Sequence, residues 1–134
     1  MAATVVSCSK KEDTVNVSKG NLVGTWEVYK EIDKEDGEMD VDDEWGSNYG
    51  LIWAFEFRSD NTGVETWKDH YDGTWYTDEY YFTYTLNGNT LRIKYYDEDE
   101  YYYENYTIEK LTSNQLVLTW KDGGYSETYY LKRI

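Results

Sequence analysis

The sequence predicts an all-β protein in which eight antiparallel strands follow one another in up-and-down (meander) order and close into a barrel. Three observations support this fold class. Apolar and polar residues alternate with a period of two from Asn21 onward, which is typical of half-buried strands. Turn-forming residues interrupt the alternation at short intervals. Helical periodicity is nearly absent, and no proline interrupts any strand.

The alternation defines the individual strands, which are expected over 22–32, 50–58, 63–68, 74–86, 89–96, 101–109, 115–120 and 125–133. All links between them are short except the connection 33–49, so consecutive strands are expected to pair with each other. An open meander would leave unpaired edges on both sides, and closure into a barrel removes them. A sandwich of the same strands is the alternative.

The first two strands carry aromatic-rich apolar faces. In the first, alternation places Trp26 and Val28 on one face, and Lys30 falls on that face as well. The odd-numbered residues of the second strand share its apolar face: Leu51, Trp53, Phe55 and Phe57.

The later strands are separated by clear turns. Asn87-Gly88 is the strongest hairpin signal in the chain, because both residues accept positive φ angles. The charged run 97–100 forms another turn that its charge keeps out of the core. The side chains expected to point inward from the fourth to seventh strands are Tyr80, Phe82, Tyr84, Leu86, Leu91, Ile93, Tyr95, Tyr102, Tyr106, Leu116, Leu118 and Trp120.

Composition and charge exclude several functional classes. The chain has 134 residues, which is enough for one domain with its own core. Asp and Glu outnumber Lys and Arg by 27 to 13, and a net charge of −14 disfavours binding to nucleic acid or anionic lipid. A single cysteine excludes an internal disulfide, and a single histidine excludes most zinc sites. We therefore expect no metal and no cofactor.

Residues 1–20 have the character of a leader, and 21–134 form the barrel domain. The leader contains a segment, Val5-Val6-Ser7-Cys8, that resembles the lipobox of bacterial lipoproteins. In that family Cys8 carries the lipid, and the polar residues 9–20 would be a flexible tether. Ser9 after the cysteine resembles the signal for outer-membrane sorting. This resemblance implies a lipoprotein on the periplasmic or outer side of that membrane, attached to it only through Cys8.

The barrel region resembles the lipocalins. Gly24-Thr25-Trp26 is similar to the Gly-x-Trp signature of their first strand, whose tryptophan is covered by a basic residue from the last strand. Lys132 or Arg133 is placed for that role. The order of further motifs resembles the small lipocalin-like lipoproteins of Gram-negative bacteria: Asp60-Asn61-Thr62-Gly63, Leu86-Asn87-Gly88-Asn89-Thr90-Leu91, Ile108-Glu109-Lys110-Leu111-Thr112 and the terminal Tyr-Leu-Lys-Arg-Ile.

The barrel interior is the first candidate site. A barrel of eight strands has room for its own side chains or for one small ligand. An apolar pocket with tyrosine hydroxyls as polar handles and a packed core are therefore both open. The candidate pocket residues are Trp26, Trp53, Phe55, Phe57, Tyr80, Phe82, Tyr84, Tyr95, Tyr102, Tyr106 and Trp120. Trp45 and Tyr49, at the end of the long connection, are candidates for a lid.

Charged residues suggest two further features. Alternation points Lys30, Glu104 and Glu127 inward, where a charge must be paired, meet a ligand or reach water at the barrel mouth. We expect them at the mouth. The acidic residues of 33–44 do not have EF-hand spacing, so we expect a solvated loop there in preference to a calcium site.

Aromatic residues on the outer surface offer an alternative function, because rings flanked by carboxylates are common in glycan-binding sites. The candidates are Trp67, Tyr71, Trp75, Tyr76, Tyr101 and Tyr103. Cross-strand stabilisation of the sheet is the simpler explanation of these residues. No nucleophile motif accompanies His70, and we expect no catalytic residues and no enzymatic activity.

The resulting hypothesis is a monomeric, lipid-anchored envelope protein with a lipocalin-like barrel that binds a small apolar or amphipathic, neutral ligand without catalysis. A surface module for glycans and an accessory or structural protein with a filled barrel are the alternatives.

Overall fold

The computed structural model describes residues 17–134. In chain order the elements are α2 (Lys19–Leu22), β1 (Gly24–Glu35), β2 (Glu38–Asp42), the 3-10 helix η1 (Ser47–Tyr49), β3 (Leu51–Phe57), β4 (Thr62–Tyr71), β5 (Thr74–Asn87), β6 (Thr90–Asp97), β7 (Glu100–Leu111), β8 (Gln115–Asp122) and β9 (Tyr125–Arg133). No helix in this part of the chain combines the length and apolar character needed to cross a membrane.

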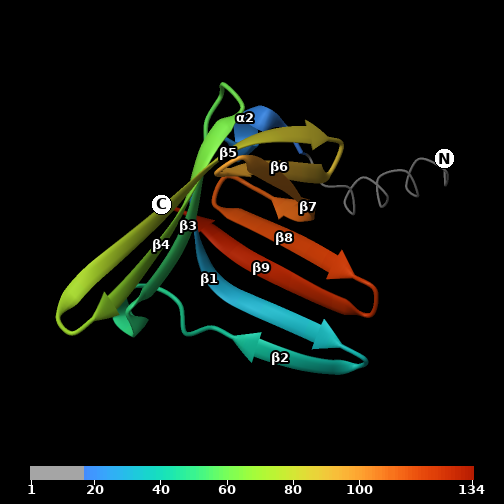
Figure 1. Cartoon of the computed structure of the whole chain (residues 1–134). Coiled ribbons are helices and arrows are strands. Elements are labelled where there is room, and N and C mark those ends of the chain that lie inside the picture. The colour runs from blue at the N-terminus through green and yellow to red at the C-terminus, as the bar shows by residue number, and fades with distance from the viewer. Residues whose placement is uncertain (1–16) are drawn as a thin grey trace.

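The strands form one antiparallel sheet that closes on itself. Consecutive strands from β3 to β9 pair as neighbours, and β1 pairs with both β3 and β9. These eight strands make the barrel. β2 is an additional strand that pairs with the last residues of β1, Glu31–Glu35. The predicted eight-stranded up-and-down barrel is therefore confirmed (Figure 1).

The expectation of one long loop over 33–49 is wrong. β1 continues to Glu35, and β2 returns alongside it after a tight turn in which Asp36 and Gly37 both have left-handed φ angles. The acidic residues obscured this hairpin, because β2 carries a charged residue at every second position and exposes all of its side chains. The solvated acidic segment is thus mostly β-structure.

The barrel is more open at the end away from α2. β1 pairs with β3 only over Gly24–Glu27, and farther along, over Glu31–Glu35, it pairs with β2 instead. In Figure 1 the β1–β2 hairpin and the long β4–β5 hairpin diverge on the side opposite α2. β5 also extends beyond its partner β6, since their pairing starts only at Phe82.

A β-bulge in β1 reverses the orientation of the side chains that follow it, so that odd-numbered residues face inward after the bulge. The register with β9 shifts between Val28 and Lys30, so that Glu31, and not Lys30, pairs with the inward-facing Tyr129. The expectation that Lys30 points into the barrel is therefore wrong. Its ammonium group lies 4.8 Å from the ring of Tyr130 on the outer face.

The end of the barrel near α2 is filled. Trp26 is fully buried, and its indole N–H donates to the carbonyl of Leu22 at 2.8 Å. The guanidinium of Arg133 covers the Trp26 ring at 4.2 Å, so Arg133 and not Lys132 is the stacking cation. Ser18 caps α2 and Val17 packs against the core, which gives the last residues of the expected tether a place in the domain.

Replacing Arg133 with Ala should reduce the free energy of unfolding by about 2 kcal/mol, because several interactions are lost together. The guanidinium also donates hydrogen bonds to the carbonyls of Asn21, Val23 and Ser113. Replacing the exposed neighbour Lys132 with Ala should change the free energy by no more than about 0.5 kcal/mol. Urea unfolding measures both variants, and equal losses would contradict this account of the closed end.

Candidate functional site

A cavity of about 590 Å³ occupies the half of the barrel away from α2. This volume is within the range of roughly 300–1,000 Å³ that is usual for small-molecule sites. Six of the barrel strands contribute side chains, so the site is a property of the barrel and not of one loop. The residues around it are Glu31, Trp53, Glu65, Trp67, Tyr102, Tyr103, Glu104, Tyr106, Trp120, Glu127 and Tyr129.

The candidate pocket residues divide into three groups. Trp53, Tyr102, Tyr106 and Trp120 line the cavity. Tyr80 is 47% exposed and lies where β5 extends beyond β6, outside the cavity lining. The others are buried and fill the closed half or its boundary with the cavity: Trp26, Phe55, Phe57, Phe82, Tyr84 and Tyr95. The interior is thus packed at one end and hollow at the other.

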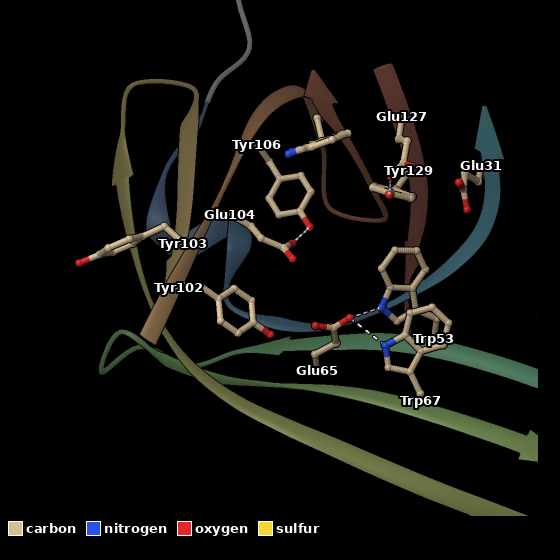
Figure 2. A pocket seen from close by; sticks show the side chains of 11 residues that line it. Glu31, Trp53, Glu65, Trp67, Tyr102, Tyr103, Glu104, Tyr106, Glu127 and Tyr129 are labelled. Carbon is tan, nitrogen blue, oxygen red and sulfur yellow. Dashed lines mark hydrogen bonds between the residues drawn. The ribbon is translucent and has the colours of Figure 1, made fainter. Parts of the chain in front are cut away.

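Glu65 is the residue that organises the floor of the cavity, a role that the alternation of apolar and polar residues does not predict. Its Oε2 accepts hydrogen bonds from the indole N–H groups of Trp53 and Trp67, at 2.7 and 2.9 Å. Its Oε1 accepts a hydrogen bond from the hydroxyl of Tyr95 at 2.6 Å. Figure 2 shows this carboxylate between the two indoles and Tyr102. One acidic side chain of β4 thereby joins β3, β4 and β6.

Trp67 faces the cavity, so its assignment to the outer surface is wrong. It is the direct cross-strand partner of Trp53, and partners in an antiparallel pair point to the same face. The two indole rings stack with centroids 4.5 Å apart and planes 16° apart. The pairing register of the β3–β4 hairpin predicts this placement, because it sets Trp67 opposite the inward-facing Trp53.

Two further carboxylates of the cavity also accept hydrogen bonds from tyrosines. Glu104 accepts one from Tyr106, and Glu127 accepts from both Tyr125 and Tyr129. Burial and the adjacent carboxylates raise the pKa values of Tyr106 and Tyr129 above the ordinary range for a phenol. These hydroxyls therefore stay protonated and act as donors.

The cavity carries negative charge without a basic partner. Glu31, Glu65, Glu104 and Glu127 line it, and its described lining contains no Lys, Arg or His. Among residues 17–134 the sole salt bridge joins Arg58 to Glu56, at solvent-exposed positions elsewhere on the barrel. Glu104 and Glu127 face inward as expected, and each accepts a hydrogen bond from at least one tyrosine.

Two acidic groups of the cavity have raised pKa values. Burial, followed by the hydrogen bond and charge of Asp33 and then the charges of Glu127 and Asp42, raises the pKa of Glu31 to about 8. Burial also raises the pKa of Glu104, with smaller contributions from nearby carboxylates, while the hydrogen bond from Tyr106 opposes the shift. The carboxylate oxygens of Glu31, Asp33 and Glu127 lie within 4.8 Å of one another.

The two candidate lid residues differ in position. Trp45 packs against the stacked indoles, with ring centroids 5.6 Å from Trp53 and 6.1 Å from Trp67. Its own indole nitrogen is buried without a hydrogen-bond partner. Tyr49 is 58% exposed. The lipidation candidate Cys8 lies outside the residues that the structure describes.

The remaining outer aromatic residues do not form one surface. Tyr71, Trp75 and Tyr76 lie at the end of the β4–β5 hairpin, whereas Tyr101 and Tyr103 lie on β7. On β7 the rings are covered by cations from β6: Arg92 lies 3.7 Å from the Tyr103 ring and Lys94 lies 4.2 Å from the Tyr101 ring. Tyr103 borders the cavity, but Figure 2 shows its ring extending away from the other lining side chains. Ring faces covered in this way are less available for stacking on a sugar.

Replacing Glu31 with Gln should stabilise the protein at alkaline pH and have little effect at pH 4. The folded state holds a proton on Glu31 that the unfolded chain releases near the ordinary pKa of 4.5, so stability falls as the pH rises from 4.5 to about 8. The Glu31→Gln variant has no proton to release at this position, so its free energy of unfolding does not fall in this way. We expect its melting temperature at pH 8.5 to lie about 2–4 °C above that of the wild type. Thermal unfolding at both pH values, with the exposed Glu109→Gln as control, measures the effect. A gain of equal size at pH 4 would contradict the assignment.

Comparison with known proteins agrees with this architecture. The family model of the lipocalin-like domain matches residues 22–118. A lipocalin-like protein from Bacteroides uniformis ATCC 8492 is similar with a TM-score of 0.55 and 17% identity, over 86% of this chain and 100% of that one. An uncharacterized protein from Bacteroides eggerthii DSM 20697 is similar with a TM-score of 0.56 and 12% identity, over 84% and 99% of the two chains.

At these identities the solved structures show a likeness of fold alone. Among curated proteins, none matches the chain. The family match covers most of the barrel, from Leu22 at the end of α2 into β8, and agrees with the observed barrel of antiparallel strands. The chain therefore belongs to the family of lipocalin-like domains.

Proposed function

We propose that this protein binds a small amphipathic organic molecule in the open half of its barrel, without catalysing a reaction. The observation that carries this proposal is the cavity of about 590 Å³ between strands whose other end is fully packed. The lipocalin-like fold is consistent with binding of a small ligand.

The cavity has the two properties that such binding needs. Its aromatic walls are fixed before a ligand arrives, because Trp53 and Trp67 are stacked and both are hydrogen-bonded to Glu65. A prearranged wall avoids the entropy cost of ordering side chains on binding. Carboxylates and phenols at the same site supply polar groups that fix the orientation of a ligand.

We further propose that the protein acts as a monomer at the bacterial outer membrane, on its periplasmic or external side, through a lipid on Cys8. The lipobox-like segment before Cys8 and the polar residues 9–20 support this proposal. A net charge of −14 is compatible with a domain that stays clear of anionic lipid headgroups.

Binding can be tested with N-phenyl-1-naphthylamine, a neutral apolar probe that becomes fluorescent in a dry pocket. The wild type should bind it, and replacing Trp67 with Ala should weaken binding at least tenfold because one wall of the cavity is removed. Replacing Trp75 with Ala is the matched control, since that ring lies beside His70 on the exposed hairpin. Wild-type affinity in the Trp67 variant, with a loss in the Trp75 variant, would move the site to the outer surface.

The anchor can be tested in cells that export the chain through a bacterial lipoprotein signal peptide placed before the segment that ends at Cys8. Replacing Cys8 with Ala should release the protein from the membrane fraction, whereas replacing Ser9 with Ala should leave it bound, because only the cysteine accepts the lipid. Cell fractionation followed by immunoblotting measures the distribution. An unchanged membrane fraction in the Cys8 variant would contradict lipid anchoring at this position.

A further inference from the structure

We propose that the ligand of this cavity is an organic cation: an ammonium group attached to an apolar or aromatic body. This inference rests on the proposed binding function and names the chemical class that the site selects. It follows from a cavity in which carboxylates and aromatic rings alternate and from which basic side chains are missing among the described residues.

The first step concerns charge balance. Four carboxyl side chains from four different strands, Glu31, Glu65, Glu104 and Glu127, surround one space. Burying a carboxylate is costly unless an opposite charge or hydrogen bonds compensate for the lost water. The tyrosine and tryptophan donors supply hydrogen bonds, but they supply no positive charge. A bound cation would provide it.

The second step concerns the acceptor atoms that remain for a ligand. The Oε2 atom of Glu104 accepts from Tyr106, and its Oε1 atom has no donor among the described residues. Figure 2 shows the Glu104 side chain extending from β7 toward the middle of the site, in the direction of Glu65. An ammonium group at this place would donate to Glu104 and lie near the Glu65 carboxylate, where charge-assisted hydrogen bonds are strong.

The third step concerns the aromatic walls. The indole N–H groups of Trp53 and Trp67 are occupied by Glu65, so these residues can offer a ligand their ring surfaces but not their donors. Tyr102 is stacked on Tyr95 with centroids 5.1 Å apart, which leaves its other face for the cavity. Ring faces attract cations, and the attraction grows when the cation is removed from water.

The size of the cavity favours an organic cation over a metal ion. A water molecule takes up about 30 Å³ in the liquid. A metal ion with its shell of oxygen ligands would leave most of a space of about 590 Å³ empty, and the ring faces cannot coordinate it. A molecule with a hydrocarbon or aromatic body uses both the walls and the carboxylates.

Calorimetry with a matched series of probes tests this inference. The probes are 2-phenylethylamine, 2-phenylethanol and phenylacetate at pH 7.5, which share a phenyl ring and differ in charge. We expect the amine to bind at least tenfold more tightly than the alcohol, and phenylacetate to show no binding. Replacing Glu104 with Gln should weaken amine binding about tenfold and leave alcohol binding unchanged. Glu109→Gln, on the exposed side of the same strand, is the control that should change neither.

The outcomes separate this inference from the proposed function. Equal affinities for the amine and the alcohol would overturn the cation preference while leaving the cavity as a binding site. Binding of N-phenyl-1-naphthylamine that the amine does not displace would overturn it as well. Absence of binding for every probe, the neutral naphthylamine included, would overturn the proposed function itself. Stabilisation by calcium chloride without any response to the amine would assign the carboxylates to a metal ion. If Glu104→Gln fails to fold, Glu127→Gln tests the charge requirement instead: both Glu127 oxygens already accept from tyrosines, and the loss of its negative charge should still weaken binding of the amine and not of the alcohol.

Discussion

The three hydrogen bonds accepted by Glu65 are the interactions on which the interior of this barrel depends. They join side chains of β3, β4 and β6 at the level where the packed half ends and the cavity begins. Without this carboxylate, two indole N–H groups and a phenol would lack acceptors inside the protein, and unsatisfied buried polar groups are costly. The stacked pair Trp53–Trp67, and with it one wall of the cavity, depends on the same residue.

A second constraint is the bulge between Val28 and Lys30, because it determines the charge of the interior. In a regular strand, Lys30 and Ile32 would face inward, and the site would contain one cation. The bulge places Glu31 and Asp33 on the inner side instead, opposite Tyr129 and Glu127. The raised pKa of Glu31 is the electrostatic consequence of this change. Part of the acidic composition of the chain is thus located inside the barrel, where it acts on a ligand more strongly than surface charge does.

The fold was largely predictable from the sequence, because alternation, turn residues and the absence of proline are properties of each strand separately. The site was less predictable, since it depends on how strands pair. On β4 the inward positions are Gly63, Glu65 and Trp67, and Gly63 leaves the space that the Phe82 ring occupies. That face contains no apolar alternation, so the sequence pattern alone points Trp67 outward and gives no indication that Glu65 faces inward. The bulge in β1 was equally hidden, because Lys30 and Glu31 are both polar.

The β1–β2 hairpin shows the same limit. Its turn residues Asp36 and Gly37 form a good hairpin signal, but the flanking residues are mostly charged, and charged segments favour a loop assignment. The strand forms here because β1 is already held by β9 and offers a free edge to the returning chain. Tertiary context of this kind is not contained in the residues of β2 themselves.

The location of the ligand is the central claim, and the indole N–H resonances test it most directly. The chain has six tryptophans, which are distributed between the packed end, the cavity and the exposed hairpin. In a ¹⁵N-resolved NMR titration with 2-phenylethylamine, the account predicts that the indole signals of Trp53 and Trp67 shift while those of Trp26 and Trp75 stay in place. Shifts confined to Trp75, with no change at Trp53 or Trp67, would contradict it.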